Sequence, residues 1–221
     1  MINLEVKGII FDMDNTLLAS RIDFTAMKED ISQLMIANKL MAVDFNYMDY
    51  TASQLIKMAQ EAEGINEEIS RQIWQAVTDH EARGMVGAKL EEGIVLGLQQ
   101  LKPSFTLAVL TNNGQAAAEL ALNETGIADY FDLIVGRDKV KELKPDPAGV
   151  RYIIESFPEI SIEEWVLVGD SWIDGKAAQE CNIAFIAYQG NKIDMNKQKV
   201  FPVASIGRME QLLSLFGVGG K

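Results

Sequence analysis

Two aspartates separated by one residue, Asp12 and Asp14, directly follow the apolar run from Ile9 to Phe11. In an extended chain, residues i and i+2 project to the same side. The spacing therefore predicts that both carboxylates face one crevice at the carboxyl end of a buried strand. Like charges held this close are costly unless a cation or a shared proton relieves them. The pair alone would also fit a strand that ends in a solvated acidic turn.

The composition restricts the class of protein. With 221 residues and 48% apolar residues, the chain is long enough for one large globular domain or two modest ones. The formal net charge of −12 disfavours nucleic acid and anionic membranes as partners, so an anionic substrate needs local positive charge or a metal. We found no apolar run near the roughly 20 residues of a membrane span and no secretory signal, so we expect a cytoplasmic enzyme. Cys181, the single cysteine, cannot form an internal disulfide.

A helical block follows the acidic pair. Apolar residues recur at helical spacing from residue 23 to residue 84, which predicts a small helical bundle. The expected N-caps of its helices are Asp23, Thr51 or Ser53, and Asn66. We interpret His80, the only histidine, as a structural residue of the third helix rather than a catalytic one.

Strands and helices alternate in the remainder of the chain. We expect strands at 6–11, 106–110, 131–135, 165–168 and 184–188, and helices at 93–101, 115–124, 147–157, 176–180 and 209–216. Such alternation predicts an α/β fold with a parallel sheet covered on both faces. Sites in these sheets form beyond the carboxyl ends of the strands. The predicted domains are a catalytic α/β core, 1–20 with 85–221, and an inserted helical domain, 21–84.

Three further polar segments fall where chemistry would be expected. They are Thr111-Asn112-Asn113 and Gly169-Asp170-Ser171, each after a predicted strand, with Asp174 four residues beyond Asp170, and Lys144-Pro145 in a loop. Hydroxyl and amide groups at a strand end can bind an anion, and the proline restrains the backbone that presents the lysine. Each segment alone could be an ordinary loop, but their joint occurrence in this order argues against that interpretation.

These segments resemble the four motifs of the haloacid dehalogenase-like (HAD) superfamily. The motifs correspond to Asp12–Thr16, Thr111, Lys144-Pro145, and Gly169–Ser171 with Asp174, and the resemblance covers 6–20 and 88–216. The helical block resembles the inserted helical cap of subfamily I. Most relatives have Gly at the place of Asn15, and Asn tolerates the left-handed conformation that such a turn requires. The resemblance implies a Rossmann-like parallel sheet with strand order 5-4-1-2-3.

The resemblance also implies phosphatase chemistry with Mg²⁺. Asp12 would be the nucleophile that forms an aspartyl-phosphate, and Asp14 would be the general acid and base. The expected metal ligands are the carboxylates of Asp12 and Asp170 and the backbone carbonyl of Asp14. Asp174 would either bind the metal directly or hold one of its ligands in place. Thr111, Asn112 and Lys144 would hold the phosphoryl oxygens.

The substrate is less well specified than the chemistry. The general resemblance to phosphoglycolate phosphatase-like members implies a small phosphorylated metabolite. A sugar phosphomutase resembling β-phosphoglucomutase is the alternative enzyme, and a non-catalytic binding or regulatory module is the alternative from another class. The intact motif set argues against the module. The sequence leaves open whether the protein is a monomer or a homodimer.

Overall fold

The computed structural model describes residues 5–218, which form two compact units. The division falls after Ser20 and after Gly87. Unit 2, Arg21–Gly87, is therefore an insertion in unit 1, which contains the rest of the chain.

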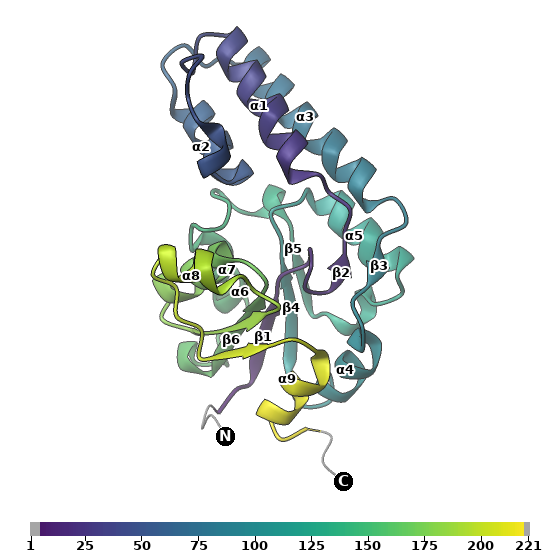
Figure 1. The fold of residues 1–221 in the computed structure, drawn as a ribbon. Coiled ribbons are helices and arrows are strands. Elements are labelled where there is room, and N and C mark those ends of the chain that lie inside the picture. Colours follow the sequence, from purple (N-terminus) through teal and green to yellow (C-terminus); the bar gives the residue numbers. More distant parts are fainter. Residues whose placement is uncertain (1–4, 219–221) are drawn as a thin grey trace. The chain divides into compact units, whose positions relative to one another are not determined.

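Unit 1 is built on a parallel sheet of six strands in the order β5-β4-β1-β6-β7-β8 (Figure 1). The strands are β1 (Gly8–Phe11), β4 (Thr106–Leu110), β5 (Leu133–Val135), β6 (Trp165–Gly169), β7 (Ala184–Tyr188) and β8 (Ala204–Ile206). Every residue of β1 and β6 is buried, as expected for strands covered on both faces. The strand that carries the acidic pair therefore lies in the middle of the sheet, between β4 and β6.

Helices cover both faces of this sheet. One face carries α4 (Ile94–Leu101), α5 (Gln115–Glu124) and α9 (Met209–Leu215), and the other carries α6 (Ala148–Ser156), α7 (Trp172–Glu180) and α8 (Lys192–Lys197) (Figure 1). Right-handed crossovers require this distribution, because the chain runs in one direction from β1 to β5 and in the other from β6 to β8. The core beneath α6 and α7 contains Val150, Ile153, Trp165, Leu167 and Phe185. Short 3-10 turns occur at Ala128–Tyr130, Arg137–Lys139 and Ile162–Glu164.

The α/β class is confirmed, and the strand order differs in detail from the expected 5-4-1-2-3. The five expected strands lie in that order, and β8 adds a sixth strand beside β7, at the edge of the sheet. Only three residues form β8, and a serine occupies its centre, so it lacks the apolar run that marked the other strands.

A small hairpin-like pair lies where the chain leaves and re-enters unit 1. Strand β2 (Leu18–Ala19) pairs in antiparallel fashion with β3 (Lys89–Leu90). The two points at which the insertion interrupts unit 1 are therefore adjacent, although Lys89 lies 70 positions after its partner Ala19 in the sequence.

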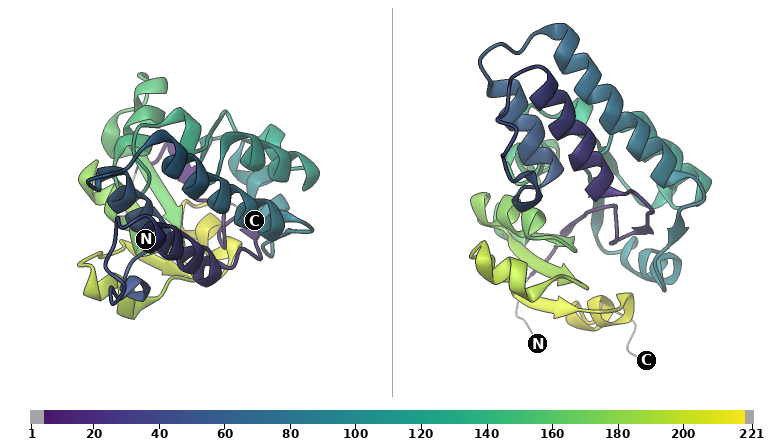
Figure 2. Two further views of the ribbon diagram at one scale, coloured as in Figure 1. Left: turned by 90° about the horizontal axis from the view of Figure 1, so that it is seen from above. Right: turned by 45° about the horizontal axis from the view of Figure 1, so that its top comes forward.

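Unit 2 is helical, as predicted. It contains α1 (Phe24–Ala37), α2 (Ala52–Glu61) and α3 (Glu67–Met85), with a 3-10 turn at Tyr47–Asp49, and α1 and α3 lie side by side (Figures 1 and 2). The side chains of Asp23, Thr51 and Asn66 cap these helices, which confirms the expected N-caps. Nε2 of the buried His80 lies 2.7 Å from Oδ2 of Asp30 and so links α3 to α1. Within residues 5–218, no helix has the length and apolar character that crossing a bilayer would require.

Candidate active site

The polar residues after β1, β4 and β6 meet at one edge of the sheet. Phe11 pairs with Val109 and with Val168, so the three strands end at the same level. The chain continues from these ends into Asp12, Thr111 and Asp170. The Asp12 N–H extends the ladder by donating to the Val168 carbonyl at 2.9 Å. Connections leave β1 in opposite directions on its two sides, which makes this edge a topological switch point.

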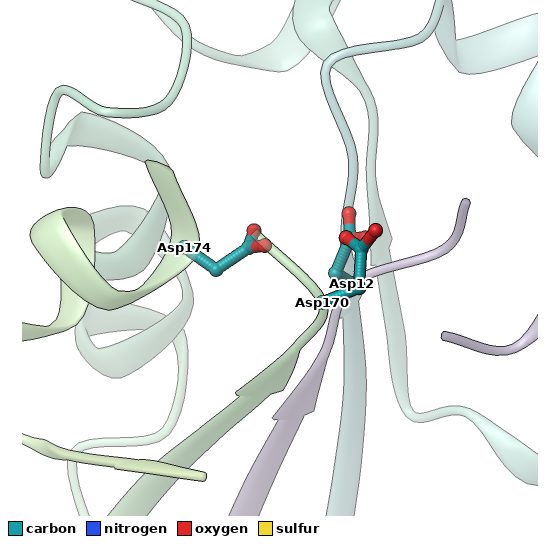
Figure 3. Close-up of side chains that lie close together, drawn as sticks. All are labelled: Asp12, Asp170 and Asp174. Carbon is teal, nitrogen blue, oxygen red and sulfur yellow. The ribbon is translucent and has the colours of Figure 1, made fainter. Parts of the chain in front are cut away.

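Three carboxylates gather at this edge. One oxygen from each of Asp12, Asp170 and Asp174 lies within 4.8 Å of the others, and Asp174 reaches toward the ends of β1 and β6 from α7 (Figure 3). Helix α7 begins at Trp172 rather than at the expected residue 176, because Asp174 Oδ2 accepts from the Ser171 N–H and forms a capping box. A Cβ at Gly169 would lie 2.5 Å from Cγ of Asp174, so only glycine leaves room for this carboxylate.

Lys144 is bound by this cluster. Its Nζ donates to Asp12 Oδ1 at 2.6 Å, to Asp174 Oδ1 at 2.7 Å and to the Leu110 carbonyl at 2.8 Å. Burial alone would lower the pKa of Lys144, but the carboxylates of Asp12 and Asp174 outweigh burial and raise it. The side chain is 3% exposed, and all three donors of its ammonium are used within the protein. Lys144 is therefore a fixed positive charge against Asp12.

Asn112 presents this lysine. Its Oδ1 accepts from the Lys144 backbone N–H at 2.9 Å, and its Nδ2 donates to the Lys144 carbonyl at 3.0 Å. The Lys144–Pro145 peptide bond is cis. The amide of Asn112 is thus occupied by the loop that carries the lysine.

One lysine does not neutralise the crowded carboxylates. Burial raises the pKa of Asp12 well above its ordinary value; Lys144 opposes this rise, while Asp174 and Asp170 add to it. Burial, together with the charge of Asp174, also raises the pKa of Asp170 to about 7. A divalent cation would relieve this crowding, and several carboxylate oxygens on one side of a crevice are the donors that Mg²⁺ prefers. The residues present therefore fit such an ion.

The second aspartate of the pair lies in a different environment. Asp14 Oδ2 accepts from Nδ2 of the buried Asn113 at 2.8 Å, while Asp14 Oδ1 is buried and has no hydrogen-bond partner among the described residues. Burial raises the pKa of Asp14; the Ser20 hydroxyl, the Lys144 ammonium and the Asn113 amide oppose this rise. The Ser20 hydroxyl nevertheless lies outside hydrogen-bonding geometry. Asp14 therefore favours its protonated form more than a solvated aspartate would.

Two hydroxyl groups and a strained turn complete the geometry. Asn15 adopts φ +55°, the left-handed conformation expected of this turn. Thr16 Oγ1 lies 3.4 Å from Asp12 Oδ2. Thr111 Oγ1 accepts from the Asn113 backbone N–H at 3.1 Å, which leaves the hydroxyl hydrogen of Thr111 available to an anion.

Comparison with known proteins assigns the family. The family model described as haloacid dehalogenase-like hydrolase matches residues 9–188. The chain belongs to this family. The HAD resemblance inferred from the four motifs is thereby confirmed, and the protein is a hydrolase of this family.

Curated relatives of this HAD hydrolase include phosphoglycolate phosphatases. That of Nitrosospira multiformis is 29% identical over 182 residues, covering 80% of each chain. That of Neisseria meningitidis is 30% identical over 184 residues, covering 79% of this chain and 76% of the relative.

Solved structures agree with the fold. A hydrolase from Pseudomonas syringae has a TM-score of 0.71 at 18% identity, and the match covers 96% of this chain and 98% of that hydrolase. A haloacid dehalogenase-like family protein from Streptococcus pneumoniae has a TM-score of 0.66 at 19% identity, and the match covers 96% of this chain and 99% of that protein.

Within this HAD hydrolase, the sequence-predicted side chains differ in how they reach the site. Contacts or mutual distances join Asp12, Asp170, Asp174 and Lys144 directly, and Asn113 connects Asp14 with Thr111. The side chain of Asn112 contacts the backbone of Lys144 instead. From the sequence, Asn113 was named only as part of the run Thr111-Asn112-Asn113 that could bind an anion, and its contact with Asp14 was not predicted.

Proposed function

We propose that this HAD hydrolase is a Mg²⁺-dependent phosphatase that hydrolyses a small phosphorylated metabolite through an aspartyl-phosphate on Asp12. The observation that carries the proposal is the buried Asp12 carboxylate, which has a fixed ammonium at 2.6 Å and two further carboxylates beside it. A carboxylate can attack a phosphoryl group only if the repulsion between two anions is offset. Lys144 supplies one positive charge there, and the acid cluster would bind a second.

In the proposed first step, an oxygen of Asp12 attacks phosphorus. The bond from phosphorus to the leaving oxygen breaks, and that oxygen takes a proton from the carboxyl of Asp14, so an alcohol leaves. In the second step Asp14 accepts a proton from water, the water oxygen attacks phosphorus, and the bond to Asp12 breaks to release inorganic phosphate. The raised pKa of Asp14 supports this use, because the first step needs a protonated carboxyl.

The remaining residues would orient and neutralise. Asp12 and Asp170, with the carbonyl of Asp14, would hold Mg²⁺, whose charge would offset that of the phosphoryl oxygens. Asp174 would act mainly through Lys144 and the α7 cap, since both of its oxygens accept hydrogen bonds from them. Thr111 would donate its free hydroxyl hydrogen to a phosphoryl oxygen. We place Lys144 as the charge partner of Asp12 and Asn112 as the residue that positions it; direct phosphate binding by Asn112 remains a prediction.

Phosphoglycolate is the first substrate to test, because the curated relatives carry that name. Every residue with a proposed chemical role lies in unit 1. We therefore propose that unit 2 is the cap that selects among phosphoesters rather than performing the chemistry.

The test measures inorganic phosphate released from a panel of phosphorylated metabolites, with Mg²⁺ and with a chelator. Activity that requires Mg²⁺ and is absent from Asp12→Asn supports the mechanism. Reduction of the trapped acyl phosphate with borohydride would mark residue 12 for mass spectrometry. Full activity without divalent cations, or in Asp12→Asn, would exclude the proposal. Conversion of a sugar 1-phosphate to a 6-phosphate without phosphate release would instead assign a phosphomutase.

A further inference from the structure

The two oxygens of the Asp14 carboxyl are not equivalent. Oδ2 accepts a hydrogen bond of 2.8 Å from the Asn113 amide. Oδ1 is equally buried but has no hydrogen-bond partner among the described residues. A buried polar atom without a partner costs free energy, so its survival beside reacting groups points to a use during reaction.

Asn113 is itself held firmly. Its side chain is buried in the turn that follows β4, and its backbone N–H donates to Thr111 Oγ1 at 3.1 Å. Its backbone carbonyl accepts from the Arg137 N–H at 2.9 Å. Because both of these bonds use the backbone, they leave the side-chain Nδ2 able to donate to Asp14. The amide connects the turn after β4 to the turn after β1 across 99 positions of sequence.

We infer that Asn113 is the positioning residue of the acid–base carboxyl. Its amide fixes Oδ2 and so keeps Oδ1 of Asp14 open toward the leaving oxygen of the substrate. The inference rests on the proposed phosphatase function and adds a residue that none of the HAD motifs identified above contains. In a protonated carboxyl, the carbonyl oxygen is a stronger hydrogen-bond acceptor than the hydroxyl oxygen. An amide that donates to Oδ2 therefore favours the arrangement in which the transferable proton resides on Oδ1.

This arrangement has a defined role in the proton transfer. As the bond from phosphorus to the leaving oxygen breaks, the proton on Oδ1 passes to that oxygen, and the electron pair of the O–H bond remains on Asp14. Carboxyl torsions are broad and roughly two-fold, so without the amide the two oxygens can exchange places. The Ser20 hydroxyl, which is near but not bonded, could then compete for the proton-bearing oxygen.

The test uses the dependence of rate on the leaving group. Purified wild type, Asn113→Ala and Asp14→Asn are compared on a series of aryl and alkyl phosphates, and log kcat/KM is plotted against the pKa of the leaving alcohol. The ratio kcat/KM reports the steps up to loss of that alcohol. Poor leaving groups need protonation and good ones do not.

For Asn113→Ala we expect kcat/KM to fall by about 10- to 100-fold on alkyl phosphates and by much less on nitrophenyl phosphate, which makes the plot steeper. Asp14→Asn should give the steepest plot. Asn123→Ala is the matched control, since the side chain of this exposed asparagine donates to the Glu119 carbonyl within α5, away from the site. Asn113→Ser, whose hydroxyl is too short to reach Asp14, should give the same steeper plot. This variant replaces Asn113→Ala in the experiment if Asn113→Ala does not fold.

Two outcomes would overturn the inference. An equal fall on every substrate would mean a merely structural role, and weaker inhibition by inorganic phosphate would mean that Asn113 binds the phosphoryl group. Failure of the proposed function is a separate result, because wild type would then show no hydrolysis that depends on Asp12.

Discussion

Asp170 should make the metal-free protein less stable as the pH rises. Its pKa is raised from 3.8 to about 7 by burial and by Asp174. Between these two values the folded protein holds a proton that the unfolded chain has already lost. The free energy of unfolding therefore falls as the pH passes through this window, which is opposite to the behaviour of a salt-bridged aspartate.

The magnitude follows from the size of this change. A carboxyl whose pKa moves from 3.8 to about 7 can alter the free energy of unfolding by up to about 4 kcal/mol. The loss is complete above pH 7, when the folded state also carries the charge. Asp170→Asn removes this carboxyl and also lowers the charge felt by Asp12, so both effects flatten the pH dependence.

The assay is urea unfolding at pH 5 and pH 8 in a chelator, followed by tryptophan fluorescence in a Trp74→Phe background. Trp165 and Trp172 then report on unit 1, because Trp74 belongs to unit 2. The control is Asp129→Asn, an exposed aspartate of unit 1. At pH 8, Mg²⁺ should raise the free energy of unfolding of the wild type by about 2.7 kcal/mol at 100 times its Kd. The increase should be smaller for Asp170→Asn, which lacks one of the proposed metal ligands.

One result would refute this reasoning. If wild type and Asp170→Asn lost the same stability between pH 5 and pH 8, the carboxyl of Asp170 would not be titrating in that window. The crowding at the strand ends would then not be relieved by a proton held on Asp170.

Other changes to the site and the insertion have separable outcomes. Asp12→Asn should lower turnover by more than about 1,000-fold while leaving the thermal midpoint equal or higher, since it removes a charge from a crowded buried set; a lower midpoint in thermal unfolding would contradict this account. Gly169→Ala should displace Asp174 and cost about 1–3 kcal/mol in urea unfolding together with most activity; unchanged kinetics would show that the position of Asp174 matters little. Replacing 21–87 with a short Gly/Ser bridge is geometrically feasible because β2 and β3 pair directly. The folded product should still hydrolyse an activated aryl phosphate but lose selectivity among metabolites, and unchanged selectivity would show that unit 2 is not the selector.

The sequence predicted most of the fold because its signals are local. Asn66 as a cap and the strand at 106–110 were read from neighbouring residues alone, and the structure has both. The start of α7 was placed four residues too late, because Gly175 within the pattern concealed the cap at Ser171. Strand β8 was missed because its conformation depends on pairing with β7, which no local pattern records.

The candidate site was predictable to the extent that its chemistry depends on residue type. Asp12, Asp170 and Lys144 each stand after a strand or beside a proline, and carboxylate and ammonium groups in such places have few structural uses. Their mutual distances follow from a parallel sheet whose strands end at one level. A reader of the sequence could therefore expect these three charges to meet.

The partner of Asp14 was not predictable in the same way. An asparagine in a turn is ordinarily a turn residue, and nothing in the run Thr111-Asn112-Asn113 distinguishes the amide that contacts Lys144 from the one that contacts Asp14. The distinction arises only when β4 lies beside β1, which places consecutive residues of one turn against different neighbours. Two asparagines with the same local signal thus acquire separate tasks, one toward the charge partner of the nucleophile and one toward the acid. The two alanine variants should therefore have different kinetic effects. Asn112→Ala should lower kcat/KM by a similar factor for every substrate, because it acts through Lys144, whereas Asn113→Ala should lower kcat/KM most for substrates with poor leaving groups.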